Sequence, residues 1–98
     1  MSAYLFHIEL TEVNDQVASL TSLQRTHIDR LLAVGHLISY SVSLSGNQIW
    51  CIVEAEDEQE ALTIVADFPL RNLFKDAVCQ PLKFHNSVPV SLPGVSLN

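Results

Sequence analysis

Apolar and polar residues alternate along four separate stretches of the chain, as they do in half-buried strands. The four stretches are residues 3–10, 37–44, 48–55 and 77–84. Between the second and the third, residues 45–47 are Ser-Gly-Asn, a composition typical of a tight hairpin turn. In the fourth, Pro81 has no N–H to donate to a neighbouring strand, which predicts an edge strand.

Two further segments repeat their apolar residues at the spacing of an amphipathic helix. In the first segment these residues are Val17, Leu20, Leu23, Ile28, Leu31 and Leu32. Asn14 or Asp15 can cap its start with a short side-chain oxygen, and Gly35 can end it in a left-handed conformation. The second segment begins at a capping-box-like sequence at residues 57–60 and stops or bends at Pro69.

The resulting order, β-α-β-β-α-β, predicts an α+β fold of the ferredoxin-like type. This fold has a four-stranded antiparallel sheet with two helices on one face. The 98 residues suffice for one domain, which we expect at residues 1–85. Residues 86–98 are predicted to form an extended C-terminal arm on a neighbouring subunit, because Val88, Val90 and Leu92 alternate with serine and proline.

Successive side chains of a strand point to opposite faces, which divides each predicted strand into two sets. The set predicted to lie under the helices is Tyr4, Phe6, Ile8, Leu10, Ile38, Tyr40, Val42, Leu44, Ile49, Cys51, Val53, Val78, Leu82 and Phe84. Gln80 is the one polar residue that falls in register with it. The set predicted on the uncovered face is Leu5, His7, Glu9, Leu37, Ser39, Ser41, Ser43, Gln48, Trp50, Ile52, Glu54, Cys79 and Pro81. This mixed face suits a cavity between two sheets packed face to face, which predicts a dimeric α/β barrel.

The composition points the same way, because only 16% of the residues are charged, against about 25% in typical soluble domains. A small chain with so little charge is expected to bury apolar surface in a homodimer or larger homo-oligomer. The net charge is −6 and the five Lys and Arg residues are scattered, which disfavours nucleic-acid binding and an anionic substrate.

The sequence predicts neither a membrane-spanning segment nor a secretion signal. No apolar run approaches the roughly 18 residues of a membrane span, and the first residues lack the features of a secretion signal. Two cysteines make no disulfide framework, and Cys51 and Cys79 are expected on opposite faces of the sheet. We therefore predict a cytoplasmic protein with no membrane partner.

Two segments carry a resemblance to a known family. The sequence LFHIEL at 5–10 resembles the first strand of the muconolactone isomerases. The sequence ALTIVADFPLRNLFKDAVCQPL at 61–82 resembles their second helix, the turn after it and their last strand, and Phe-Pro-Leu at 68–70 is its most specific part. The resemblance implies a dimeric α/β barrel that moves a proton within a small lactone without a cofactor.

A weaker resemblance is to the YCII-related proteins. Arg25 and His27, in the pattern Arg-x-His, and Gly35 before a strand carry it. Both families share the dimeric α/β-barrel fold. The likeness to the isomerases further implies that His7 is a pocket residue.

The candidate catalytic residues are His7, Glu9 and Glu54, which share the mixed face. An imidazole has an ordinary pKa of about 6.5, which suits a proton shuttle near neutral pH. A carboxylate in a partly dry pocket can act as a base. The alternatives are a histidine hydrogen-bonded at a dimer interface and glutamates solvated at its rim.

Four further residues are candidates for ligand binding: Trp50, Ser39, Ser41 and His27. Trp50 can stack on a flat ligand or fill an interface core, where aromatic residues are enriched. Ser39 and Ser41 offer hydroxyls, although they also fit ordinary polar alternation along a strand. His27 lies inside the apolar stripe of the first helix, where a histidine is more often a packed core residue.

No metal or cofactor is predicted. The four histidines lie in different elements without paired ligand spacing, and the three glycines stand apart, so nucleotide phosphates have no glycine-rich loop. The leading hypothesis is a cofactor-free, isomerase-like enzyme that acts on a small lactone or related organic molecule by proton transfer. The alternatives are a non-catalytic small-molecule binding or sensing protein on the same fold, and a purely structural oligomer.

Overall fold

The computed structural model of the protein describes residues 1–11 and 15–83, and it has the predicted order of elements. The strands are β1 (Ser2–Leu10), β2 (Leu37–Val42), β3 (Gln48–Ala55) and β4 (Phe74–Leu82). The helices are α1 (Asp15–Val34), α2 (Glu58–Ala66) and a short 3-10 helix, η1 (Arg71–Leu73). The strands form one antiparallel sheet in the order β2-β3-β1-β4. The ferredoxin-like α+β prediction is therefore confirmed, with β1 central and β4 at an edge.

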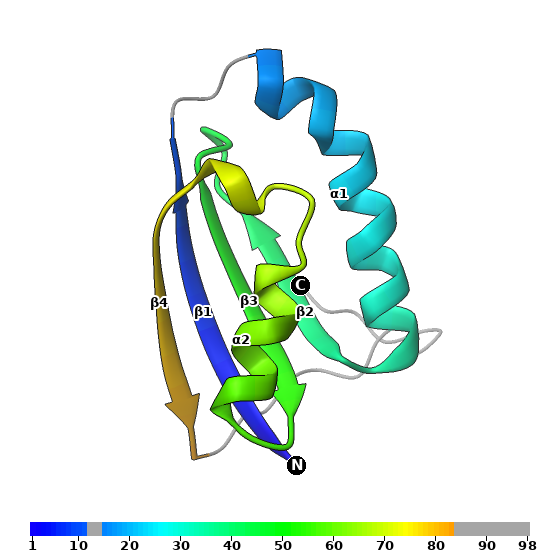
Figure 1. The fold of residues 1–98 in the computed structure, drawn as a ribbon, viewed down its shortest axis with the longest axis vertical. Helices are drawn as coiled ribbons and strands as arrows, with labels where there is room; N and C mark the ends of the chain where they lie inside the picture. Colours follow the sequence, from blue (N-terminus) through cyan, green and yellow to red (C-terminus); the bar gives the residue numbers. More distant parts are fainter. Residues whose placement is uncertain (12–14, 84–98) are drawn as a thin grey trace, which may run out of the picture.

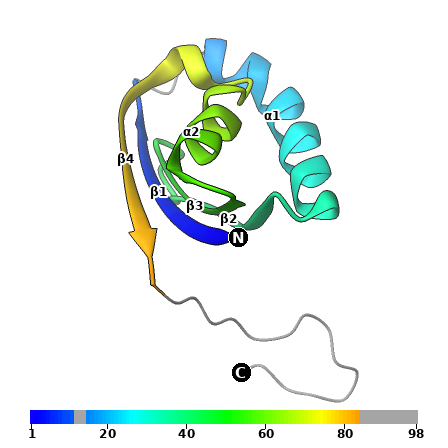
Figure 2. The same ribbon diagram turned by 60° about the horizontal axis from the view of Figure 1, so that its bottom comes forward.

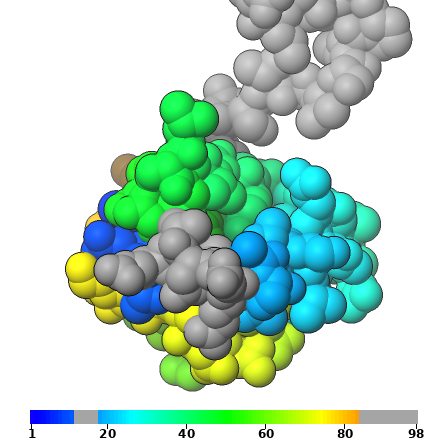
Figure 3. All heavy atoms as spheres, turned by 90° about the horizontal axis from the view of Figure 1, so that it is seen from above, coloured from blue at the N-terminus to red at the C-terminus, as the bar shows by residue number. Residues whose placement is uncertain are grey.

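The two helices lie on the same side of a curved sheet (Figures 1 and 2). α1 packs mainly on β2, and α2 packs mainly on β3. Figure 3 looks onto the end of the molecule at which α1 begins, where α1 (blue to cyan) lies beside the β2–β3 hairpin (green). Among the described residues, the other face of the sheet is covered by no helix or strand; we call it the open face. No helix in this part of the chain is long and apolar enough to cross a membrane.

Local signals in the sequence explain where the elements begin and end. The Asp57 carboxylate accepts a 2.9 Å hydrogen bond from the Glu60 N–H and so caps α2. Gly35 ends α1 with φ at +84°, a conformation that glycine adopts without strain. Gly46 has the same φ in the β2–β3 turn, as the Ser-Gly-Asn sequence predicted. The predicted cap of α1 at Asn14 or Asp15 falls outside the residues whose side chains are described.

The core lies between the helices and the sheet. The predicted covered residues of β1 and β3 are all buried: Tyr4, Phe6, Ile8, Leu10, Ile49, Cys51 and Val53. Ile28 of α1, Ala61 and Val65 of α2 and Phe68 complete it from the helical side. The division of faces is therefore confirmed for these two central strands.

In β2 the predicted division was wrong at its beginning. Leu37 pairs with Val53 and is 2% exposed in the core, although it was assigned to the open face. The register shifts between Leu37 and Ser39, because β2 spends one extra residue there, Ile38, as in a β-bulge. Leu44 lies beyond the end of the strand and is fully exposed.

In β4 the two faces are inverted relative to the prediction. Cys79 pairs with Phe6 and Pro81 with Tyr4, so both point to the helical side, while Val78 pairs with His7 on the open face. The pairing with β1 is regular over these residues, so each side chain of β4 lies on the same face as its partner in β1; the register shift between Glu9 and Leu10 affects only the start of β4. Gln80 and Leu82 therefore also belong to the open face, and the predicted Phe84 lies outside the described residues.

Candidate ligand-binding site

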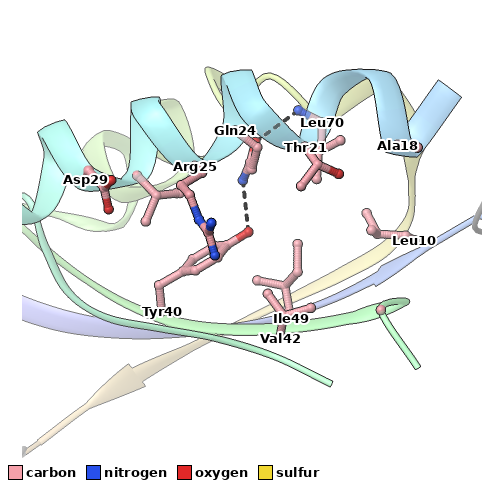
Figure 4. Close-up of a pocket in the computed structure, with 12 residues that line it drawn as sticks. Leu10, Ala18, Thr21, Gln24, Arg25, Asp29, Tyr40, Val42, Ile49 and Leu70 are labelled. Carbon is pink, nitrogen blue, oxygen red and sulfur yellow. Dashed lines mark hydrogen bonds between the residues drawn. The ribbon is translucent and has the colours of Figure 1, made fainter. Parts of the chain in front are cut away.

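A pocket of about 410 Å³ lies between α1 and the sheet (Figure 4). Its walls are mostly apolar: Leu10, Ala18, Ile28, Val42, Ile49 and Leu70. Its polar side chains come from α1 and β2: Thr21, Gln24, Arg25, Asp29 and Tyr40. An apolar cavity with a few convergent polar groups is the usual form of a small-molecule site, and a volume of about 300–1,000 Å³ is typical.

Gln24 is the buried polar residue of this pocket, at 3% exposure. Its Nε2 donates to the Tyr40 hydroxyl over 3.1 Å, and its Oε1 accepts from the Leu70 N–H, also over 3.1 Å (Figure 4). One amide thereby joins α1 to β2 and to the turn after α2. Gln24 was not among the residues predicted for the site, although a glutamine between Leu20 and Ile28 in an apolar helical stripe is a signal for a buried hydrogen-bonded side chain.

Tyr40 lies on the sheet floor of the pocket, where it pairs with Cys51 of β3. Burial raises the pKa of its hydroxyl; the hydrogen bond from Gln24 partly opposes this rise and the nearby Cys51 thiol adds to it. The hydroxyl therefore stays protonated at neutral pH. Tyr40 was predicted as a core residue, and it is both half-buried against Phe68 and part of the pocket lining.

Arg25 and Asp29 lie on the exposed side of α1 at the edge of the pocket. They are four residues apart, which places them on one face of the helix. Within the described part of the chain, the Arg25 guanidinium has no carboxylate within ion-pair distance. Figure 4 shows its side chain extending from α1 toward the Tyr40 side of the pocket. The pocket thus has one cation and one anion at its rim.

His7 lies on the open face, as its position in β1 predicted. Its ring is stacked on that of Trp50, and its Nε2 lies 2.6 Å from the Gln48 Oε1. Glu9 follows two residues later on the same face, but Glu54 pairs with Ala3, four residues from His7. Four residues of strand span about 13 Å, so the structure brings together His7 and Trp50 and leaves Glu54 apart.

The other predicted ligand residues also lie outside the pocket. Ser39 pairs with Ile52 and Ser41 with Trp50, which puts both serines on the open face. His27 is half-buried between the helices with its ring edge-on to Phe68, at 6.0 Å between centroids. It lines a shallow groove between α1 and α2. Its Nε2 is buried and has no hydrogen-bond partner among the described residues.

The two cysteines lie on the same side of the sheet, which corrects the prediction of opposite faces. Cys51 and Cys79 both pair with Phe6, from β3 and β4, and both are free thiols. The intervening strand keeps them roughly two strand spacings apart, about 9.5 Å, too far for a disulfide. Burial raises the pKa of Cys51 to about 12, and burial together with the Glu58 carboxylate raises that of Cys79. No three potential metal-ligating side chains cluster in the described residues.

Comparisons with known proteins agree with this architecture. No protein-family profile and no curated protein sequence matches the chain. Its fold resembles that of 5-chloro-2-hydroxyhydroquinone dehydrochlorinase (TftG) from Burkholderia phenoliruptrix AC1100, solved in complex with 2,5-dihydroxybenzoquinone. The match is one of fold. The TM-score is 0.68 over 84% of this chain and 95% of that chain, at 14% sequence identity. Membership of the muconolactone isomerase or YCII-related families stays a prediction.

Proposed function

We propose that this protein is an enzyme that acts on a small, flat organic molecule held between α1 and the sheet. The observation that carries the proposal is the pocket, which has an apolar lining, a volume of about 410 Å³ and polar groups that converge from α1 and β2. A single substituted ring fits such a volume. The solved dehydrochlorinase of the same fold supports this class of ligand, because its complex contains a dihydroxybenzoquinone.

The side chains at the pocket suit proton transfer. Tyr40 offers a protonated hydroxyl inside the pocket, and Asp29 offers a carboxylate at its rim. A carboxylate can take a proton from carbon while a hydroxyl stabilises the oxygen on which negative charge develops. The finer proposal, isomerisation of a lactone, rests on the sequence resemblance to the muconolactone isomerases. A binding or sensing protein would use the same pocket without turnover.

A second candidate site on the open face is favoured by the contact between His7 and Trp50. Together with Glu9, Ser39 and Ser41, these residues would need the sheet of a second subunit to enclose a ligand. In this proposal His7 is the proton shuttle and Trp50 is the stacking surface. The two sites lie on opposite faces of the same sheet, so separate substitutions can distinguish them.

The test is a matched pair of tryptophan substitutions. Val42 lines the α1 pocket and is 51% exposed, whereas Val78 lies beside His7 on the open face and is 53% exposed. Binding of 2,5-dihydroxybenzoquinone and of small unsaturated lactones would be measured by two-dimensional NMR, and turnover by ultraviolet absorbance. We expect Val42→Trp to abolish binding and Val78→Trp to leave it unchanged.

Loss of binding in Val78→Trp but not in Val42→Trp, together with loss of turnover in His7→Ala, would indicate that the site is on the open face. Binding without turnover of any probe, in the wild type, would favour the non-catalytic alternative. Absence of any binding to the wild type would contradict the proposal of a small-molecule site.

A further inference from the structure

The hydrogen bonds of Gln24 determine which groups of the pocket are donors. A backbone N–H can only donate, so the Leu70 N–H must face the carbonyl oxygen of the Gln24 amide; the two atoms lie 3.1 Å apart. The amide nitrogen is thereby turned to Tyr40. Because Gln24 is 3% exposed and its side chain bridges two elements, the amide cannot turn over without breaking both bonds.

The orientation of the amide in turn fixes the role of the Tyr40 hydroxyl. An amide NH₂ group only donates, so the Tyr40 oxygen accepts its hydrogen bond. A hydroxyl has a single proton, and that proton remains free to donate in another direction. In the described residues no acceptor takes it, and Tyr40 forms part of the pocket wall. The Tyr40 O–H is therefore available to donate a hydrogen bond to a ligand in the pocket (Figure 4).

We propose that the pocket selects molecules with a hydrogen-bond acceptor oxygen on the ring, namely a carbonyl, enolate or phenolate oxygen. This oxygen accepts a hydrogen bond from the Tyr40 hydroxyl. Gln24 is the positioning residue that directs this proton. The inference rests on the proposed function and names its substrate class. Arg25 at the rim, which has no ion-pair partner in the described part of the chain, favours the same class, because a guanidinium stabilises negative charge that develops on such an oxygen.

The decisive variant is Gln24→Glu, which keeps the shape of the side chain and replaces its NH₂ donor by an oxygen acceptor. One carboxylate oxygen still accepts from the Leu70 N–H, while the other can only accept from Tyr40 and so withdraws the Tyr40 proton from the pocket. Tyr40→Phe removes the proton altogether. Gln80→Glu, on the open face of β4, is the control for the added charge.

Acetophenone and α-methylstyrene are a suitable ligand pair, since they differ by a carbonyl oxygen in place of a methylene group. Their dissociation constants would be measured by NMR titration at pH 8 for the wild type and each variant. We expect Gln24→Glu and Tyr40→Phe to weaken acetophenone about threefold to tenfold, the range for loss of one hydrogen bond. Binding of α-methylstyrene should not change, and Gln80→Glu should behave as the wild type.

The double variant Gln24→Glu, Tyr40→Phe should weaken acetophenone no further than Tyr40→Phe alone, because Gln24 acts through Tyr40. If Gln24→Glu does not fold, Tyr40→Phe still decides whether the hydroxyl selects the ligand. Binding of both ligands with the same ratio in the wild type and Tyr40→Phe would overturn this inference and leave the proposed function standing. Binding of neither ligand to the wild type would instead contradict the pocket as a small-molecule site.

Discussion

The imidazole of His7 lies flat against the indole of Trp50, with 5.1 Å between the ring centroids and 3° between the planes. The pair occupies the middle of the open face, next to Val78, and both Trp50 and Val78 are substantially exposed, at 40% and 53%. A stacked aromatic pair on an uncovered sheet is typical of a surface that another subunit covers. The oligomer predicted from composition therefore has a definite candidate interface.

The first prediction is that this interface joins two copies of the chain. The wild type should have at least twice the 10.9 kDa monomer mass by light scattering at micromolar concentration. Trp50→Glu should give a monomer, because a carboxylate would be buried against an apolar partner surface. Leu62→Glu is the control, since Leu62 is 41% exposed on α2, away from the open face. A monomeric wild type, or equal dissociation of both variants, would contradict the prediction.

The second prediction concerns the predicted arm at residues 86–98, which lies outside the described residues. Three apolar side chains in alternation, Val88, Val90 and Leu92, are expected to dock on a neighbouring subunit, with proline limiting the entropy lost. A chain that ends at His85 should then have a lower oligomer mass or a melting temperature lower by a few degrees. The full-length chain is the reference. Equal mass and melting temperature would show that the segment contributes nothing to assembly.

The third prediction tests whether His27 is structural. Its buried Nε2 has no partner among the described residues, and an unmade hydrogen bond costs about 1–3 kcal/mol. His27→Leu should therefore raise the free energy of unfolding by about 1 kcal/mol in urea titrations. His36→Leu, at an exposed position, should change it by less than about 0.5 kcal/mol. A clear loss of stability or of ligand binding in His27→Leu would instead indicate a partner or function for this imidazole.

The fourth prediction is a loss of stability at alkaline pH caused by Cys51. Its pKa rises from 9.0 to about 12 on folding, so between these values the unfolded chain has lost a proton that the folded chain keeps. The contribution of this thiol to the free energy of unfolding is therefore fully present below pH 9. Above pH 9 it falls as pH rises, by roughly 1.4 kcal/mol per pH unit for one such group. Cys51→Ala should flatten this slope in urea titrations between pH 8 and 11.

Cys79→Ala is the matched control, because Cys79 is less deeply buried than Cys51 and should change the slope less. Tyr40, whose pKa is also raised, adds to the loss above pH 10, so Tyr40→Phe should reduce the remaining slope. An unchanged slope in Cys51→Ala would contradict the prediction. Native protein should also expose one thiol to an alkylating reagent at pH 8, namely Cys79.

The sequence predicted the fold where local signals and packing agree. In β1 and β3, apolar residues at every second position mark the buried face without ambiguity, because the opposite positions hold His7, Glu9, Trp50 and Glu54. In β4 the two faces are almost equally apolar, so the alternation of residues does not indicate which face lies under the helices, and the prediction assigned the two faces the wrong way round. At this edge strand most side chains are exposed on both sides.

The candidate site was harder to predict than the fold, because it depends on contacts between distant residues. Gln24 is only a polar interruption of a helix until the Leu70 N–H and the Tyr40 hydroxyl are placed beside it, 46 and 16 residues away. The open-face residues were easier to group, since neighbours on a sheet follow from alternation. Alternation therefore predicts that His7 and Trp50 share a face, but it contains no information on the cavity between α1 and the sheet.

The extra residue in β2 has a consequence for the chain lengths that this site tolerates. Leu37 and Tyr40 are three positions apart, an odd number, yet both point to the helical side, because the bulge at Ile38 absorbs one step of the pleat. Loss of Ile38 would leave Leu37 and Tyr40 two steps apart and both still inward, whereas loss of Ser41 would turn Val42 out of the pocket wall. We expect some relatives to lack one residue at position 38. Relatives with and without this residue should both keep the tyrosine that corresponds to Tyr40.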